Sequence, residues 1–464
     1  MIAFDNSFAR LPSRMFTAQD PTPVRAPQRL AQNDALARML GIDTDWLASP
    51  AALAIFAGNA VPDGAEPLAQ LYAGHQFGNW NPQLGDGRAV LLGEVIGTDG
   101  IRRDIQLKGA GRTPYSRGGD GRAWVGPVLR EYLVSEAMAA MGVPTTRALF
   151  AAATGEFVHR ETALPGAVLT RVAQSHIRVG TFQVHASRQD TEALRALADH
   201  VIARHYPDAH GIPGLLDAVV AGQARLIARW MGLGFIHGVM NTDNMAVSGE
   251  TIDYGPCAFI DTYDPAAVFS SIDRTGRYAY ANQPGIALWN LAQFATALIP
   301  LMPDQDAAIE DFTQRINRFP DLYQTEWVRV FGAKLGLPDP TPQDADLIQR
   351  LLTLMAQRQL DFTNTFATLT ETARDPAFDG WRGDWERRRA PDHAAIMARA
   401  NPQVIPRNHR IEAVIVAAVA GDMTPFHQML AVVTDPFAPR DAIRAPYAAP
   451  PAPQEVVTAT FCGT

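Results

Sequence analysis

A few polar residues in this sequence have types and an order that suit phosphate and metal chemistry. Lys108 ends an apolar run, Glu131 lies in the helical pattern that follows, and Asp243, Asn244 and Asp253 occur together much later. A lysine on a strand, a glutamate on the next helix and oxygen ligands on later loops form the residue set of a kinase-like phosphate site. Carboxylate and amide oxygens favour Mg²⁺ or Mn²⁺ over zinc. The set therefore predicts a site for phosphate groups and a divalent ion.

Lysine is rare in this chain, because Lys108 and Lys334 are the only lysines among 40 basic residues. A lysine within a glycine-studded motif indicates a need for a compact ammonium group rather than a guanidinium. Glu131 is its expected partner, since it lies in the first turns of a helix predicted over 128–141, and Glu136 is the competing candidate. The alternatives are a chance lysine at a strand edge and a solvated helix carboxylate.

Two further groups of residues are candidates for holding an anion. Gly85 and Gly87, next to Arg88, would let backbone N–H groups approach it closely, although no Gly-Lys-Ser/Thr follows and an ordinary turn is the alternative. Arg171 and Arg178 would clamp phosphates with two hydrogen bonds each, or would simply be surface charge. Asp243-Asn244 and Asp253 have their own alternatives, a polar turn and a strand-end turn.

The chain has two cysteines, Cys257 and Cys462. Two thiols cannot build a disulfide framework or a four-thiolate zinc site, which fits a reducing compartment. Either cysteine could still be a redox-active thiol. A pairing of the two would couple the end of the sequence to the loop of Asp253, whereas the alternative for Cys257 is a small core residue.

The elements that must position these residues predict an α+β fold. Two apolar runs, 89–96 and 102–107, flank Gly97-Thr98-Asp99-Gly100, which indicates a hairpin of two antiparallel strands ending at Lys108. Further strands are predicted at 145–152 and 167–172, and from about residue 190 the pattern becomes mainly helical. The predicted helices span 190–204, 213–231, 284–297, 304–318, 344–366 and 411–420.

This order predicts a strand-rich part followed by a helix-rich part, rather than repeating βα units. We expect an extension over 1–67, a strand-rich lobe with nucleotide-binding loops over 68–185, a helical lobe with the catalytic and metal-binding loops over 186–437, and a Pro/Ala-rich, extended tail over 438–464.

The charge and the apolar pattern of the sequence argue against several classes of function. The net charge of −8 argues against a general binder of nucleic acid or of anionic membranes. The longest apolar run, at 411–420, is shorter than the ~18 to 20 residues of a membrane span, so no transmembrane helix is expected. The first residues show no signal-peptide pattern, and a cytoplasmic location is the expectation.

Long strings of this sequence resemble the selenoprotein O family of kinase-like protein adenylyltransferases. The strings are 72–78 (YAGHQFG), 82–88 (PQLGDGR), 106–109 (QLKG), 237–245 (HGVMNTDNM), 253–256 (DYGP), 401–402 (NP) and 405–409 (IPRNH). The terminal Phe461-Cys462-Gly463-Thr464 also looks like the end of that family, with cysteine where some members carry selenocysteine.

The resemblance implies a two-lobed kinase-like fold that holds ATP inverted, so that the α-phosphate faces the acceptor. It implies transfer of AMP to a Ser, Thr or Tyr hydroxyl of a protein, with Mg²⁺ or Mn²⁺ bound and pyrophosphate leaving. Carried over by motif, Asp243 would accept the proton, and Asn244 and Asp253 would hold the metal ion. Lys108, Arg171 and Arg178 would grip the outer phosphates, Glu131 would orient Lys108, and Gly85, Gly87, Arg88, Asp120 and Gly121 would line the nucleotide site.

Two other functions use the same residues. A conventional protein kinase would bind the nucleotide the other way round, but in kinases the catalytic aspartate precedes its metal-binding asparagine by several residues, whereas Asp243 and Asn244 are adjacent. A nucleotide-binding pseudokinase that acts as a redox or stress module would have no need of both Asp243 and Asp253. Transfer of UMP from UTP is a variant of the first hypothesis.

Overall fold

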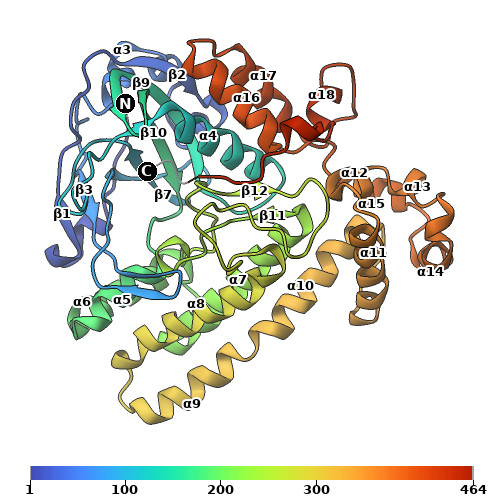
Figure 1. Cartoon of the computed structure of the whole chain (residues 1–464). Coiled ribbons are helices and arrows are strands. Elements are labelled where there is room, and N and C mark those ends of the chain that lie inside the picture. The colour runs from blue at the N-terminus through green and yellow to red at the C-terminus, as the bar shows by residue number, and fades with distance from the viewer. Residues whose placement is uncertain (1, 462–464) are drawn as a thin grey trace.

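The computed structural model describes residues 2–461, and a large antiparallel sheet dominates the first part of the chain (Figure 1). The sheet has eight strands, and β8 pairs with β10 outside the main order. In spatial order the other strands are β1 (Phe16–Ala18), β3 (Leu68–Gln70), β6 (Ala89–Ile96), β7 (Arg102–Lys108), β10 (Ala163–Ala173), β9 (Arg147–His159) and β2 (Gln28–Gln32), with β8 at Ala123–Trp124. Two small hairpins stand apart, β4 (Gly74–Gln76) with β5 (Asn79–Asn81), and β11 (Phe235–Ile236) with β12 (Ala258–Phe259).

The predicted hairpin of β6 and β7 is confirmed. Its turn closes with a hydrogen bond of 2.9 Å from Gly97 N to Ile101 O, and Gly100 has a φ of +75°, which favours glycine. The register places Ala89 opposite Lys108. On the other side of β7, β10 places Arg171 opposite Gln106. The hairpin and β10 thus bring Lys108 and Arg171 to neighbouring strands.

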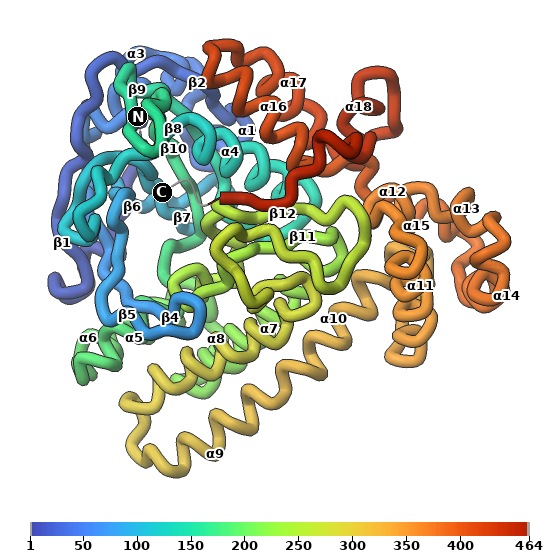
Figure 2. Tube along the Cα trace, in the orientation of Figure 1, coloured from blue at the N-terminus to red at the C-terminus, as the bar shows by residue number. Residues whose placement is uncertain are grey.

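Helix α4 (Val125–Ala140) corresponds to the helix predicted over 128–141 and lies between the sheet and two helices from late in the chain. These are α16 (Asn408–Val419) and α17 (Thr424–Val433), as Figure 2 shows. Arg130 of α4 forms an ion pair with Glu412, and the Tyr132 ring lies 5.6 Å from the Phe426 ring. Helix α4 is therefore packed on both sides.

The remaining helices form the cover of the sheet and a helical body below it (Figure 1). In the N-terminal segment, Asn33 caps α1 by accepting a 3.0 Å hydrogen bond from Leu36 N. The long central helix α7 packs against α8, α9 and α10. The bounds are α1 (Asp34–Met39), α2 (Thr44–Leu47), α3 (Pro50–Phe56), α5 (Val179–Ser187), α6 (Thr191–His205), α7 (Gly211–Leu233), α8 (Gln283–Leu298), α9 (Gln305–Ile316), α10 (Phe319–Lys334), α11 (Ala345–Gln357), α12 (Phe362–Ala367), α13 (Leu369–Thr372), α14 (Asp379–Arg388), α15 (His393–Ala400) and α18 (Ala445–Ala448).

The structure corrects two of the predicted elements. The single helix predicted over 344–366 is wrong, because Gln359 has a φ of +51° and the Asp361 side chain caps a new helix by accepting from Asn364 N at 2.7 Å. The segment predicted to be an extended tail contains the short helix α18. Its last described part is held by a bridge between Thr460 and Ser270 and by a 2.6 Å hydrogen bond from Thr460 Oγ1 to Pro256 O.

Two helical segments are long and apolar enough to cross a membrane by length and composition, in contrast to the expectation from 411–420. They are Gly211–Leu233 and Tyr280–Leu301, and 56% and 44% of their most apolar windows are buried within the fold. Burial of this kind is typical of core helices in a helical body.

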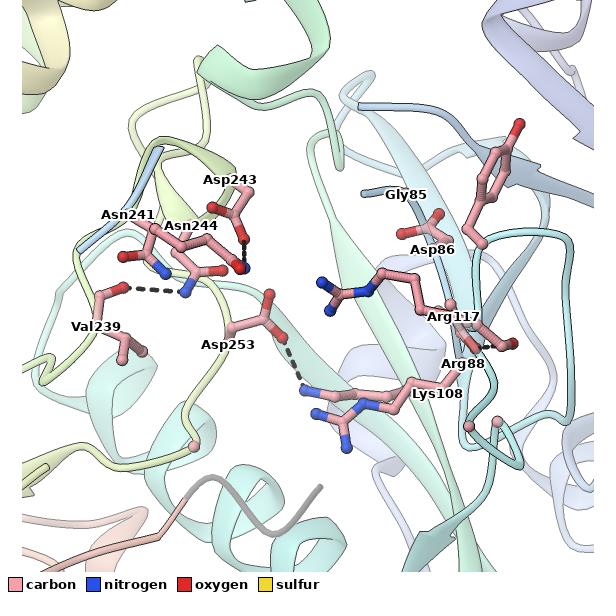
Figure 3. Close-up of a pocket in the computed structure, with 18 of the residues that line it drawn as sticks. Gly85, Asp86, Arg88, Lys108, Arg117, Val239, Asn241, Asp243, Asn244 and Asp253 are labelled. Atoms are coloured by element: carbon pink, nitrogen blue, oxygen red, sulfur yellow. Dashed lines mark hydrogen bonds and ion pairs between the residues drawn. The ribbon is translucent and has the colours of Figure 1, made fainter. Parts of the chain in front are cut away.

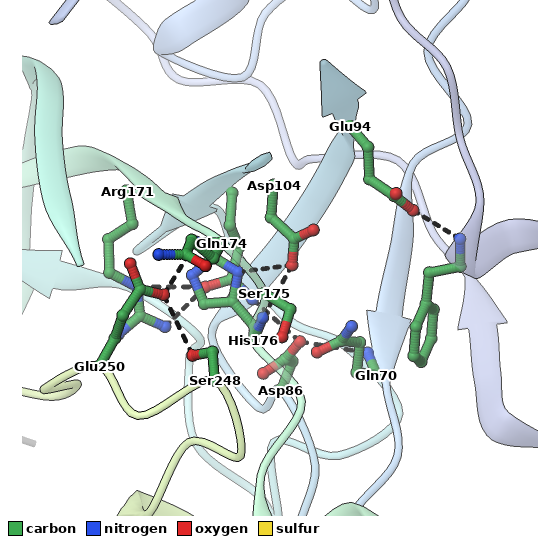
Figure 4. A network of polar contacts seen from close by, with 12 residues as sticks. Gln70, Asp86, Glu94, Asp104, Arg171, Gln174, Ser175, His176, Ser248 and Glu250 are labelled. Atoms are coloured by element: carbon green, nitrogen blue, oxygen red, sulfur yellow. Dashed lines mark hydrogen bonds and ion pairs between the residues drawn. The ribbon is translucent and has the colours of Figure 1, made fainter. Parts of the chain in front are cut away.

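A buried polar network on the sheet includes Glu94, Asp104 and His176 (Figure 4), and Arg204 ties α6 to it. Arg204 of α6 donates to Asp104 Oδ1 at 2.6 Å and to Glu94 Oε2 at 3.1 Å. The other oxygen of Asp104 accepts from His176 N at 2.8 Å and lies 2.9 Å from His176 Nδ1. Burial opposes ionisation of Asp104, yet Arg204 and His176 hold its pKa below the usual range. Charged groups thus fix the segment that leads into α5.

Glu250 lies in the same region, and among residues 2–461 no cation forms a hydrogen bond or ion pair with it. Its Oε2 accepts from Gln174 N at 2.9 Å and from Ser248 Oγ at 3.1 Å, and burial raises its pKa to about 7 from 4.5. Between these two values the unfolded chain loses the proton that the folded chain keeps, so stability falls as the pH rises through this window.

We expect Glu250→Gln to stabilise the protein at pH 8.5 by about 1 to 3 kcal/mol, because it removes the cost of ionising a buried carboxyl group. At pH 4.5 the substitution should change little. The measurement is the urea unfolding free energy at both pH values, with the exposed Glu371→Gln as control. Equal effects of Glu250→Gln at both pH values would contradict this account.

Candidate functional site

A cavity of about 570 Å³ collects residues from the sheet, the glycine-rich loops and the helical part. Figure 3 shows Asp243, Asn244 and Asp253 on one wall and Gly85, Arg88 and Arg117 on the other. Among its lining residues are Gly85, Gly87, Arg88, Lys108, Asp120, Gly121, Arg171, Arg178, Asp243, Asn244 and Asp253. Only Glu131 of the sequence-predicted site residues is not part of the lining, since it lies behind Lys108 on α4.

Lys108 is held by two carboxylates. Its Nζ lies 2.5 Å from Glu131 Oε2 and 2.8 Å from Asp253 Oδ1. The competing candidate, Glu136, instead forms an ion pair of 2.6 Å with Arg147. The structure thus brings Lys108 and Glu131 together as the sequence predicted. Both side chains are buried, and each buried charge needs a partner of opposite charge to offset its loss of hydration.

Asp253 lies among three cations. Its Oδ1 is 2.8 Å from both Lys108 Nζ and Arg171 Nη1, and its Oδ2 is 3.7 Å from Arg178 Nη2. Burial opposes ionisation of Asp253, yet Lys108, Arg171 and Arg178 hold its pKa well below the usual range. Its φ of +63° is uncommon for a residue other than glycine, and such strain is typical of functional sites.

Two residues that the sequence analysis did not single out fix the two arginines. Gln106 Oε1 accepts from Arg171 Nε at 3.1 Å and from Nη2 at 2.6 Å, while its Nε2 donates to Asp86 Oδ2 at 3.1 Å. Asp86 Oδ1 in turn lies 3.5 Å from Arg178 Nη1. The period of a strand was the available signal, since Gln106 and Lys108 are two residues apart and therefore share a face.

Asp243 differs from Asp253 because no cation of the described residues forms an ion pair with it. Gln76 Nε2, from the hairpin β4–β5, donates to Asp243 Oδ2 at 3.1 Å, and the buried Oδ1 has no hydrogen-bond partner within residues 2–461. Burial raises the pKa of Asp243 to about 6. A Cβ on Gly74 would lie 2.6 Å from Oδ1, so the hairpin backbone approaches this carboxylate as closely as glycine allows. Gln76 is a third residue that the sequence analysis missed as a contact.

Asn244 and Asp253 fit a divalent ion by their chemistry. Asn244 Nδ2 donates to Val239 O at 2.9 Å, which fixes the amide and leaves its oxygen available. One carboxylate and one amide oxygen suit Mg²⁺, which takes further ligands from substrate phosphates and water. The part of the chain that the structure describes has no group of three or more His, Cys, Asp or Glu arranged for a metal, which agrees with the absence of a zinc pattern.

The glycine-rich wall is shaped by close backbone contacts. A Cβ on Gly85, which has a φ of +108°, would lie 2.5 Å from the Tyr115 ring, and one on Gly121 would lie 2.1 Å from Gly111 O. Asp120 stabilises this loop, since it accepts from Arg122 N at 2.9 Å and pairs with Arg160 at 2.8 Å. Both glycines are therefore required by the packing of this wall against Tyr115 and Gly111.

Cys257 is buried next to this site and is not a reactive thiolate. Burial raises its pKa to about 12, which favours the protonated form and the alternative of a core residue. Cys462 lies outside the described residues, and so does a pairing of Cys462 with Cys257, which is the less favoured alternative.

We expect Gln106→Leu to lower the free energy of unfolding by about 1 to 3 kcal/mol, because it leaves Nε and Nη2 of the buried Arg171 guanidinium without their acceptor, while Nη1 keeps Asp253. The matched control is Gln70→Leu on β3, where both side-chain polar atoms are buried without a partner in the described chain. That substitution should be neutral or stabilising. Urea unfolding of both variants measures the contrast, and an equal loss in the two would refute it.

Comparison with known proteins identifies the relatives of this chain. A family described as "Protein adenylyltransferase SelO" matches residues 1–384. The chain is 62% identical to the protein nucleotidyltransferase YdiU of Ruegeria pomeroyi over 475 aligned residues, which cover 100% of this chain and 99% of that protein. Proteins of the same name from Jannaschia sp. and Rhodopseudomonas palustris are 60% and 55% identical, each with 99% of both chains covered. The chain therefore belongs to the SelO family.

Proposed function

We propose that this protein transfers AMP from ATP to hydroxyl groups of protein side chains and releases pyrophosphate. Membership of a family described as protein adenylyltransferases supports the reaction class, and the relatives named nucleotidyltransferases support it over their whole length. The observation that carries the proposal is one cavity that holds three clustered cations beside a buried, unpartnered carboxylate oxygen. The cations would neutralise phosphates, and the Asp243 carboxylate would take a proton.

The strand-rich and helix-rich parts would be the two lobes of a kinase-like fold, with the nucleotide between them. A cavity lined by Lys108 and Arg171 from the sheet and by Asp243 and Asn244 from the helical part supports this arrangement. The glycine-rich wall at Gly85 and its neighbours would then receive the nucleotide, as the resemblance implies.

Lys108, Arg171 and Arg178 would bind the outer phosphates of an inverted ATP. Arg171 and Arg178 are fixed by Gln106 and Asp86, so their guanidinium groups are ordered before the phosphates arrive. Preorganised charge of this kind stabilises the charge that develops on the leaving pyrophosphate. Glu131 would keep the Lys108 ammonium in place.

Asp243 would be the proton acceptor. The acceptor hydroxyl oxygen forms a bond to the α-phosphorus, the bond from that phosphorus to the bridging oxygen of pyrophosphate breaks, and the hydroxyl proton moves to the Asp243 carboxylate. The Gln76 amide donates to Oδ2 and orients this carboxylate. A pKa of about 6 leaves the carboxylate mostly ionised near neutral pH and still basic enough to accept a proton.

Asn244 and Asp253 would hold Mg²⁺ or Mn²⁺. A bound divalent ion supplies charge neutralisation and orientation for phosphate oxygens. The fixed amide of Asn244 and the cation-held carboxylate of Asp253 keep their positions without the ion, because each has its own protein contacts.

The reaction is tested with ATP labelled at either the α- or the γ-phosphate, together with a protein acceptor, Mg²⁺ and reductant. We expect label on protein from the α-position alone, a fall of about 10² to 10⁴-fold with Asp243→Asn at unchanged ATP affinity, and loss of transfer with Asp253→Ala. The exposed Asp199→Asn on α6 is the control. Label from the γ-position alone would replace the proposal with a kinase, and ATP binding without label would favour a pseudokinase.

The metal assignment is tested with Asn244→Ala. We expect the Mg²⁺ concentration that gives half-maximal transfer to rise by about tenfold or more, because one of the two protein ligands is lost. Calorimetric titration of Mg²⁺ into the protein bound to a non-hydrolysable ATP analogue should show the same weakening. The exposed Asn317→Ala serves as control, and an unchanged metal requirement in Asn244→Ala would remove this residue from the metal site.

A further inference from the structure

The end of the cavity away from the glycine-rich wall has features that no step above uses. This end is lined by Gln76 and Phe77 of the β4–β5 hairpin and by Ile272, whose side chain is 58% exposed. The Asp243 carboxylate lies beside this hairpin. An acceptor protein has to bring its hydroxyl to Asp243, so a segment of the acceptor has to lie over this end.

Arg277 borders the β4–β5 hairpin beside this end of the cavity and has no counter-ion among the described residues. Within residues 2–461 no carboxylate oxygen lies within 4.0 Å of its guanidinium, and its Nε is buried without a hydrogen-bond partner. The guanidinium carbon lies 4.9 Å from the Trp289 ring centre and 5.7 Å from that of Tyr278. Stacking on aromatic rings holds a guanidinium in place but does not neutralise it.

The nearest acidic residue of the loop is already engaged. Asp273 accepts from Arg277 N at 2.9 Å through Oδ1 and from Tyr278 N at 2.8 Å through Oδ2. Its carboxylate therefore fixes the backbone of the loop, and the guanidinium is left for another partner. Arg274, on the same loop, is exposed and adds to the positive charge.

Hydrogen bonds connect the loop of Arg277 to Asn241, which lies two residues before Asp243. Tyr278 OH donates to Asn241 Oδ1 at 2.6 Å, and Phe77 N donates to the same oxygen at 3.0 Å. A Cβ on Gly78 would lie 3.7 Å from the Arg277 guanidinium carbon, so the hairpin turn that carries Gln76 and Phe77 also borders Arg277. The unpaired cation and Asp243 thus flank one hairpin.

We propose that Arg277 binds an aspartate or glutamate side chain of the acceptor protein, close in sequence to the hydroxyl that receives AMP. This inference rests on the proposed function, since it assigns a preference to its acceptor. A carboxylate would give the guanidinium charge-assisted hydrogen bonds in a half-buried place and would satisfy Nε. The aromatic faces of Trp289 and Tyr278 preorganise the guanidinium, so little side-chain entropy is lost on binding.

The test uses the full chain and synthetic peptides with a single serine. In three parallel sets the residue at each position from one to five places away from the serine is glutamate, glutamine or lysine. Transfer of AMP is followed from α-labelled ATP. At the best position we expect kcat/KM for the glutamate peptide to exceed that for the glutamine peptide by about five- to tenfold, as for a partly buried ion pair.

Variants separate recognition from a structural role. Arg277→Gln should reduce the glutamate preference to about one while the glutamine peptide is still modified, and Arg277→Glu should reverse the preference toward lysine. The exposed Arg274→Gln should keep the wild-type preference. Calorimetric ATP affinity and the unfolding midpoint of Arg277→Gln should stay at wild-type values, which shows that the nucleotide site is intact.

Two results overturn the inference. If wild-type protein modifies the three sets equally, or if Arg277→Gln keeps the glutamate preference, Arg277 does not recognise the acceptor. The proposed AMP transfer is unaffected by either result. If no peptide and no protein acceptor receives α-label, the proposed function fails and the inference fails with it.

Discussion

The site depends on one carboxylate, that of Asp253, which joins the sheet to the helical part of the chain. Lys108 comes from β7, Arg171 from β10 and Arg178 from the start of α5, and all three converge on this side chain. Buried like charges repel, so three cations stay together only because carboxylates lie among them, and Asp253 is the one that approaches all three, while Glu131 and Asp86 each pair with some of them. Asp253 also has a strained backbone conformation, and the ion pairs of its carboxylate offset that strain. The positions of the two arginines, the conformation of the Asp253 loop and the contact between the two parts of the chain therefore all depend on the same set of ion pairs.

The sequence predicted local features from its own patterns and the assembly of the site through the resemblance. The Asp-Gly turn between β6 and β7 and the pairing of Lys108 with Glu131 followed from local patterns, because turn chemistry and helix facing depend on near neighbours. The strand period places Gln106 on the face of Lys108, but its contact with Arg171 also required knowing that β10 lies beside β7. Asp361, which caps the helix after the break at Gln359, pairs with Arg407 from far along the chain, and no local pattern predicts that pair. Helix α10 was not predicted, although Pro320 lies in its first turn, where proline favours a helix start.

The site and its border contain both paired and unpaired polar atoms. Lys108 and Arg171 are held by carboxylate or amide oxygens of the protein itself, and Arg178 Nη1 lies near Asp86. Asp243 Oδ1, Arg178 Nε and, beside the β4–β5 hairpin, Arg277 Nε are buried without a partner among the described residues. Unpaired buried groups are costly, so these atoms mark where stability has been given up for contact with other molecules. The cost falls on a small hairpin and a loop, not on the sheet.

The double packing of α4 has a consequence for control of the enzyme. The helix that carries Glu131 has thirteen buried residues, lies against the sheet on one side and against α16 and α17 on the other, and is fastened through Arg130 and Glu412. Swinging such a helix outward would expose much of its apolar surface and separate an ion pair, at a cost comparable to the stability of a whole domain. Glu131 thus keeps its position beside Lys108. A regulator of this protein has to act at the entrance through which nucleotide and acceptor pass, and not by moving this helix.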